Sequence, residues 1–106
     1  MSPHILVLTA FPDMDIATRL AQEIVQTRLA ACVNILPQAK SVYMWQGKQC
    51  MDSEYIVIMK TTESRYQKLQ SFIQSQHPYE LPEIIATPIT QGLDDYLDWM
   101  AKSVST

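Results

Sequence analysis

The chain has few basic residues, which limits the partners it can bind. Eight Lys and Arg residues against eleven Asp and Glu residues give a formal net charge of −3 over 106 residues, and the basic residues are scattered. Proteins that bind nucleic acid or acidic membranes usually carry a clustered basic surface. We therefore expect neither nucleic acid nor a membrane to be the main partner.

Long apolar runs are also missing. Apolar runs such as Ile5–Leu8 and Tyr55–Met59 are far shorter than the roughly 20 residues with which a helix crosses a bilayer. The first residues, Met1–His4, lack the basic start and long apolar region of a secretory signal. We therefore expect a cytoplasmic protein.

The chain has only two cysteines and few features that suggest catalysis. Cys32 and Cys50 show no Cys-x-x-Cys spacing, so in a reducing compartment we expect free thiols. The sequence holds no nucleophile elbow, phosphate-binding loop, metalloprotease helix or Cys/His cluster. It therefore gives no basis for naming an enzyme reaction.

What is present in the first half is a regular alternation of strand and helix patterns. The apolar run His4–Ala10 predicts a buried strand. Asp13 is a plausible N-cap, and an apolar stripe then predicts a helix that ends near Leu29. Residues 31–45 and 48–61 are rich in β-branched and aromatic side chains and are separated by a short Gly-containing connector, so they predict one long hairpin.

The hairpin and the segments after it complete this pattern. Pro37 marks the first hairpin strand as an edge strand or a bulge. Thr62–Ser64 opens a second helix with a hydroxyl available as cap. The connector His77–Glu83 leads to a last strand over residues 84–89, and Gly92 precedes a terminal helix.

The predicted order is βαββαβ plus a C-terminal helix in one domain, residues 1–106. This is the ferredoxin-like α+β sandwich, in which both long helices cover one sheet face. The first strand nevertheless places Ile5 and Val7 on one side and Leu6 and Leu8 on the other. One chain cannot bury both sides, so the sequence predicts an oligomer.

The connector His77–Glu83 holds an imidazole, a phenol and two carboxylates within seven residues. Its prolines force His77 to end the helix and hold the segment rigid. His77 then suits the carbonyl end of the helix dipole as a structural residue. Alternatively, it is a ligand or an acid/base group, together with Glu80 and Glu83.

Five stretches together resemble the CutA family. They cover nearly the whole chain in the family's order and spacing, and they are Leu29–Ile35, Tyr43–Lys48, Lys60–Thr61, His77–Ile84 and Asp95–Trp99. Members of this family are small cytoplasmic ferredoxin-like proteins associated with divalent-cation tolerance, and they form tight trimers similar to the PII signalling proteins. The resemblance therefore implies a non-catalytic homotrimer connected with tolerance of divalent metal ions such as copper.

The resemblance also implies a metal site, although two of its residues differ here. The family's proposed copper ligands are a Cys on the first strand and two adjacent His before the Pro-Tyr pair. Thr9 stands at the Cys position and Gln76 at the first His position, which leaves His77, with Glu83 close in sequence. A tight Zn or Cu site normally needs three or four ligands. We therefore expect His77 and Glu83 to bind a divalent metal, Cu or Zn, only weakly.

A ligand cleft is predicted where subunits meet. Lys60 ends the second hairpin strand, whereas Tyr79 and Glu80 follow the opposite end of a helix about 20 Å long. These ends can meet only if they belong to two different chains. We therefore predict a cleft formed by Lys60, Tyr79 and Glu80, with Lys60 within salt-bridge distance of Glu80 or Glu83.

Aromatic side chains are predicted to fill the subunit interface. Tyr43, Trp45 and Trp99 each combine an apolar body with a polar tip, which suits a partly wet boundary. Stacking on a ligand is the alternative.

Three functions from different classes stay open at this point. The first is a non-catalytic trimer that acts in metal tolerance. The second is a PII-like sensor that binds a small molecule or anion at subunit clefts. The third is an enzyme that uses His77, Glu80 and Glu83.

Overall fold

The computed structural model describes residues 3–105. Its elements are, in order, β1 (His4–Phe11), α1 (Met14–Gln26), β2 (Cys32–Trp45), β3 (Lys48–Thr62), the 3-10 helix η1 (Glu63–Arg65), α2 (Tyr66–Gln76), β4 (Ile85–Pro88) and α3 (Asp94–Val104). The predicted βαββαβ order with a further C-terminal helix is confirmed. The fold is ferredoxin-like.

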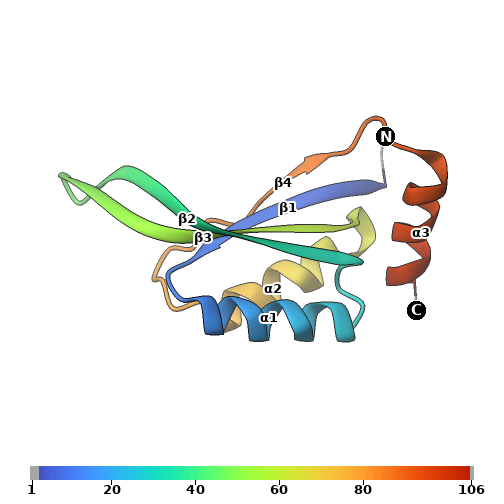
Figure 1. Ribbon diagram of the computed structural model, residues 1–106, viewed down its shortest axis with the longest axis horizontal. Coiled ribbons are helices and arrows are strands. Elements are labelled where there is room, and N and C mark those ends of the chain that lie inside the picture. The colour runs from blue at the N-terminus through green and yellow to red at the C-terminus, as the bar shows by residue number, and fades with distance from the viewer. Residues whose placement is uncertain (1–2, 106) are drawn as a thin grey trace.

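One antiparallel sheet with strand order β2-β3-β1-β4 organises the molecule. Helices α1 and α2 lie side by side on one face, and α3 stands at the end of the sheet (Figure 1). Strands β2 and β3 continue past the helices, so the outer part of the hairpin projects beyond them (Figure 1). Most of the second sheet face is therefore left without helices.

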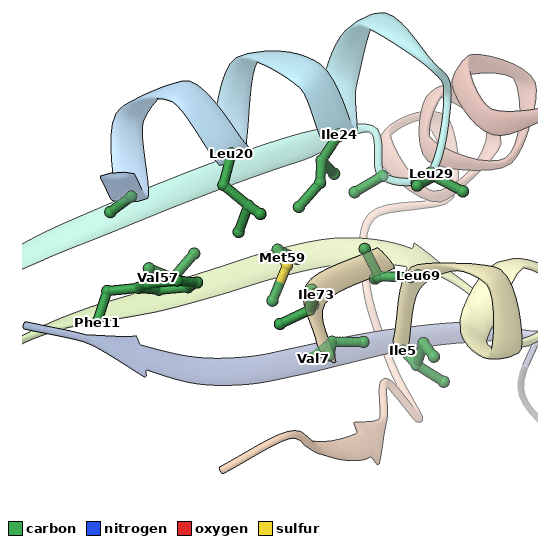
Figure 2. Close-up of a cluster of buried hydrophobic side chains, with 12 residues drawn as sticks. Ile5, Val7, Phe11, Leu20, Ile24, Leu29, Val57, Met59, Leu69 and Ile73 are labelled. Carbon is green, nitrogen blue, oxygen red and sulfur yellow. The ribbon is translucent and has the colours of Figure 1, made fainter. Parts of the chain in front are cut away.

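The core lies between the sheet and the helices α1 and α2 (Figure 2). Val7 of β1 and Met59 of β3 are partners across the two strands, and both are fully buried. Ile24 of α1 and Ile73 of α2 close the cluster from the helix side. Burial of each such side chain stabilises the fold by about 1.5–3 kcal/mol. Because side chains alternate along a strand, this burial determines which positions of β1 and β3 face the helices.

Helix α1 begins as predicted and ends earlier. The Asp13 carboxylate accepts a hydrogen bond from the backbone N–H of Ile16 at 3.0 Å, which confirms the N-cap. The helix stops at Gln26 and not near Leu29, because Arg28 takes a left-handed backbone with φ 61°. The N–H of Leu29 then bonds back to a carbonyl in the helix, as in a Schellman ending.

Two further boundaries differ from the predictions. Thr62 does not cap a helix with its side chain; its hydroxyl lies 3.0 Å from the Ser64 hydroxyl, and η1 occupies the first turn before α2. Strand β4 covers Ile85–Pro88 and is shorter than the predicted 84–89. Short elements next to proline are ended by local geometry that apolar periodicity does not report.

The hairpin has the features that its sequence suggests. The pairing of β2 with β3 shifts between Leu36 and Ala39, around Pro37 and a positive φ at Gln38. Strand β2 is the sheet edge, so the predicted edge strand with a bulge is confirmed. At the tip, Gln46 and Gly47 have φ of 51° and 80°, as two-residue hairpin turns require.

We call the sheet face opposite α1 and α2 the open face. It carries Leu6 and Leu8 of β1 and their neighbours on β3, and these side chains are only partly buried. Leu36 and Ile85, which continue this apolar surface onto the outer strands, are 45% and 54% exposed. The second apolar side expected from the sequence is therefore present. Within residues 3–105, no helix is long and apolar enough to cross a membrane.

Candidate functional site

The connector after α2 is held to the sheet by His77. The residue ends the helix with an extended backbone, as the following proline predicts. Its ring stacks on Phe11 with centroids 4.2 Å apart. Nε2 lies 2.6 Å from the Ala10 carbonyl, and Nδ1 lies 3.1 Å from the backbone N–H of Tyr79.

These two contacts fix the protonation of the His77 ring. A carbonyl only accepts and a backbone N–H only donates, so Nε2 carries the proton and Nδ1 does not. Burial lowers the pKa of His77, and the hydrogen bond to Ala10 and the charge of Glu54 oppose this shift only in part. His77 is therefore held as a neutral ring that links α2, β1 and the connector.

A buried carboxylate fixes the next part of the connector. Glu54 is only 8% exposed, and its Oε2 accepts a hydrogen bond from the Tyr79 hydroxyl at 2.8 Å. The Tyr79 ring also lies against His77, with centroids 4.8 Å apart. Burial, followed by the bond to Glu54, raises the pKa of Tyr79. The phenol therefore stays protonated and acts as a donor.

A cleft of about 670 Å³ opens between the outer part of the hairpin and this connector. One wall is Ala10 at the end of β1. The others come from the hairpin and from the connector, and the residues are Ser41, Val42, Tyr43, Trp45, Glu54, Pro78, Tyr79, Glu80, Leu81 and Glu83. The cleft lies where the connector passes the end of β1, and the open face continues from it. Its chemistry is acidic and aromatic.

A second phenol and carboxylate pair lies beside the cleft on the hairpin. The Tyr43 hydroxyl donates a hydrogen bond to the Asp52 carboxylate. This bond, with smaller contributions from burial and from the charge of Asp52, raises the pKa of Tyr43 to about 12. The rim of the cleft therefore presents a neutral phenol next to a carboxylate.

Most of the predicted site residues meet at this cleft. Tyr79, Glu80 and Glu83 line it, as do Tyr43 and Trp45, which were assigned to an interface. The sequence did not predict that these two groups would share one site within a single chain.

Lys60 lies elsewhere in the chain, near α3. Its ammonium is 5.8 Å from the centre of the Tyr96 ring, and the Tyr96 and Trp99 rings lie 5.4 Å apart. Lys60 does not line the cleft, so its meeting with Glu80 or Glu83 across two chains stays a prediction. Trp99 is 47% exposed, and its place in an interface also stays a prediction.

Comparison with known proteins settles which family this architecture represents. The model of the family described as "CutA1 divalent ion tolerance protein" matches residues 5–103. The chain belongs to the CutA1 family.

Individual members of the CutA1 family are similar to this chain in sequence and in structure. "Protein CutA, chloroplastic" of Arabidopsis thaliana is 46% identical over 101 residues, which are 95% of this chain and 56% of the plant protein. The "Divalent-cation tolerance protein CutA" of Thermus thermophilus is 42% identical over 92% of this chain and 95% of its own. The crystal structure of CutA1 from Oryza sativa matches with a TM-score of 0.94 at 41% identity, over 98% of this chain and 95% of that one. The chain thus spans about half of the plant relative and nearly all of the bacterial one.

A metal site of three or more ligands is not found among residues 3–105. In the part that the structure describes, no three His, Cys, Asp or Glu side chains group as metal ligands do. Both His77 nitrogens are hydrogen-bonded, whereas Glu83 lines the cleft. A metal at His77 would have to displace one of these bonds, and weak binding at His77 and Glu83 stays a prediction.

Thr9, which the resemblance places at a Cys position, has a buried hydroxyl. It is 1% exposed, and its hydroxyl has no hydrogen-bond partner among the described residues. Its register partner is the fully buried Val57, so Thr9 faces the helix-covered core. The side chain at this position does not line the cleft.

Sequence reasoning missed Glu54 as a site residue. The available signal was its position at the start of an apolar strand segment, where a carboxylate facing the sheet needs a partner. Its partner, Tyr79, is 25 residues away in sequence, so local patterns could not reveal the pair.

Proposed function

We propose that the protein acts in tolerance of divalent cations as a non-catalytic homotrimer in the cytoplasm. The observation that carries this proposal is the CutA1 family match over residues 5–103, together with relatives named as divalent-cation tolerance proteins. Weak binding of Cu or Zn through His77 and Glu83 would connect the protein to the ions.

The geometry supports a role without catalysis. His77 is held as a neutral ring, with both ring nitrogens engaged. A general base needs a free nitrogen within hydrogen-bond reach of its substrate. Positioning of the connector accounts for the contacts of His77 without a reaction.

Growth under metal stress tests the biological role. A host strain that lacks its own copy of this gene would be grown in graded copper and zinc, with and without the wild-type gene restored. We expect the restored gene to raise the tolerated metal concentration. Equal growth of both strains at every concentration of both metals would contradict the proposed role.

Competition with a chelator tests the metal site itself. We expect the purified protein to lose Cu or Zn to a modest chelator, and His77→Ala to bind more weakly still. Gln76→His restores an imidazole at the first His position of the family and should tighten copper binding, while Gln74→His places the same imidazole at a neighbouring exposed position as a control. A tight site that survives His77→Ala would show that the ligands lie elsewhere.

The cleft favours a second candidate function, that of a PII-like sensor. Small-molecule sites commonly have volumes of about 300–1,000 Å³ and combine apolar walls with a few polar groups. The cleft beside Tyr79 and Glu80 has this size and composition. A thermal-shift screen would reveal a ligand as added stability, and the absence of any shift across metabolite classes would count against a sensor.

A further inference from the structure

The charge of the cleft limits what can bind there. Three of its lining residues are glutamates, Glu54, Glu80 and Glu83, and no Lys, Arg or His from residues 3–105 lines it. Like charges repel at short range, so a phosphate or carboxylate ligand would meet an unfavourable field. The sensor candidate allowed either a small molecule or an anion as its ligand. The charge of the cleft disfavours an anion and favours a cationic ligand.

Glu54 supplies the most specific recognition group. Its side chain is nine-tenths buried, and only one of its two oxygens is satisfied, by the Tyr79 hydroxyl. The other, Oε1, makes no hydrogen bond or ion pair within the described chain. Oε1 is not among the side-chain atoms that are closed off from solvent, so a donor can reach it, and a carboxylate oxygen accepts strongly from a charged donor. Since Glu54 forms part of the cleft wall, that donor can come from a ligand.

Aromatic groups complete the wall around this carboxylate. Trp45, Tyr43 and Tyr79 line the same cleft, and aromatic faces attract ammonium and guanidinium groups. Tyr79 cannot itself satisfy both oxygens, because its single hydroxyl proton is used on Oε2. A charged N–H donor with an aliphatic stem would fit both the acceptor and the apolar surface.

We propose that this cleft binds an alkylammonium group, which donates to the free oxygen of Glu54 while Glu80 and Glu83 add attraction at the rim. This inference rests on the sensor candidate and names its class of ligand. The ammonium can be a free amine or the side chain of Lys60 from another copy of the chain.

Calorimetric titration with 1,5-diaminopentane tests the proposal. The solution contains a chelator to exclude metal bridging, and glutarate and 1,5-pentanediol serve as probes of similar length with opposite and zero charge. We expect saturable binding of the diamine, at one site per chain, and no binding of the other two. Equal heats for diamine and diol would overturn the proposal.

Matched charge variants separate the site from the general acidity of the protein. Glu54→Gln should weaken diamine binding about tenfold or more, since one charge-assisted hydrogen bond is lost. Glu23→Gln removes the same charge from an exposed position on α1, on the other side of the sheet, and should change affinity by less than about twofold. Because Glu54 is buried, the exposed pair Glu80→Gln/Glu83→Gln provides a second test that does not disturb the core. If all of these variants bind equally, the binding is nonspecific and the proposal fails.

Lys60→Met distinguishes the two sources of the ammonium. If a free amine is the ligand, this variant binds the diamine as the wild type does. If Lys60 of another copy occupies the cleft, the variant should bind at least about tenfold more tightly, because the competing ammonium is gone. Absence of binding in both proteins would overturn the inference, whereas a different ligand found by thermal shift would leave the sensor candidate standing without it.

Discussion

Replacement of His77 by Phe separates the structural role of this ring from its titration. Phe keeps an aromatic ring against Phe11 but removes both hydrogen bonds, to Ala10 and to Tyr79. Each such bond contributes a net of about 0.5–1.5 kcal/mol. We therefore expect His77→Phe to lower the free energy of unfolding by about 1–3 kcal/mol at pH 7.5.

The difference in unfolding free energy between wild type and His77→Phe should depend on pH, and this dependence tests whether His77 is neutral in the folded protein. Burial lowers the pKa of His77 below its ordinary value of 6.5, so the unfolded chain binds the proton more readily than the folded one. The contribution of neutral His77 is fully present above pH 6.5 and is lost as the pH falls through its lower folded-state pKa. The loss is at most about 1.4 kcal/mol per pH unit, and solvent screening of the half-buried ring makes it smaller.

The assay is urea denaturation of both proteins from pH 7.5 to pH 5, at one fixed protein concentration because assembly would shift the midpoint. We expect the stability difference between wild type and His77→Phe to narrow as the pH falls. All other residues are common to both proteins, so their contributions cancel in the comparison to first order. A difference that stays constant or widens toward acid would refute a neutral, hydrogen-bonded His77.

Three further changes test local features of the fold. Thr9→Val removes a buried hydroxyl without a described partner and should stabilise the protein by about 1 kcal/mol; a loss of stability in urea denaturation would mean that the hydroxyl is satisfied. In Gly47→Ala, the added Cβ has no atom within 4 Å, but alanine is strained at the φ of 80° and should destabilise the hairpin by about 1 kcal/mol. Thermal denaturation would detect this loss, and an unchanged midpoint would contradict that turn. Asp52→Asn should lower the pKa of Tyr43 from about 12 toward 10, and an ultraviolet difference titration that shows no change would argue against their hydrogen bond.

The sequence predicted the fold well because the relevant signals are local. Alternating apolar residues around Val7 and Met59, the cap at Asp13 and the bulge at Pro37 each act over a few residues. The boundaries at Arg28 and Thr62 were wrong, because a left-handed residue and a 3-10 turn interrupt patterns that otherwise read as helix.

The candidate site was predicted only in part, because its key contacts connect distant residues. The connector was identified from its prolines and polar groups, but its attachment to Ala10 and Glu54 depends on how β1 and β3 lie in the sheet. Charge alone could not show that Lys60 lies beside Tyr96, away from the cleft in the same chain.

Sedimentation equilibrium tests the central claim most directly, since the proposed homotrimer depends on copies of the chain covering the open face. Leu36 and Ile85 are about half exposed there, and apolar surface of this kind commonly marks an interface. At micromolar concentration we predict a single species with three times the 12.1 kDa mass of the chain, and Leu36→Glu should dissociate it. A well-folded monomer of 12.1 kDa at that concentration would contradict the account.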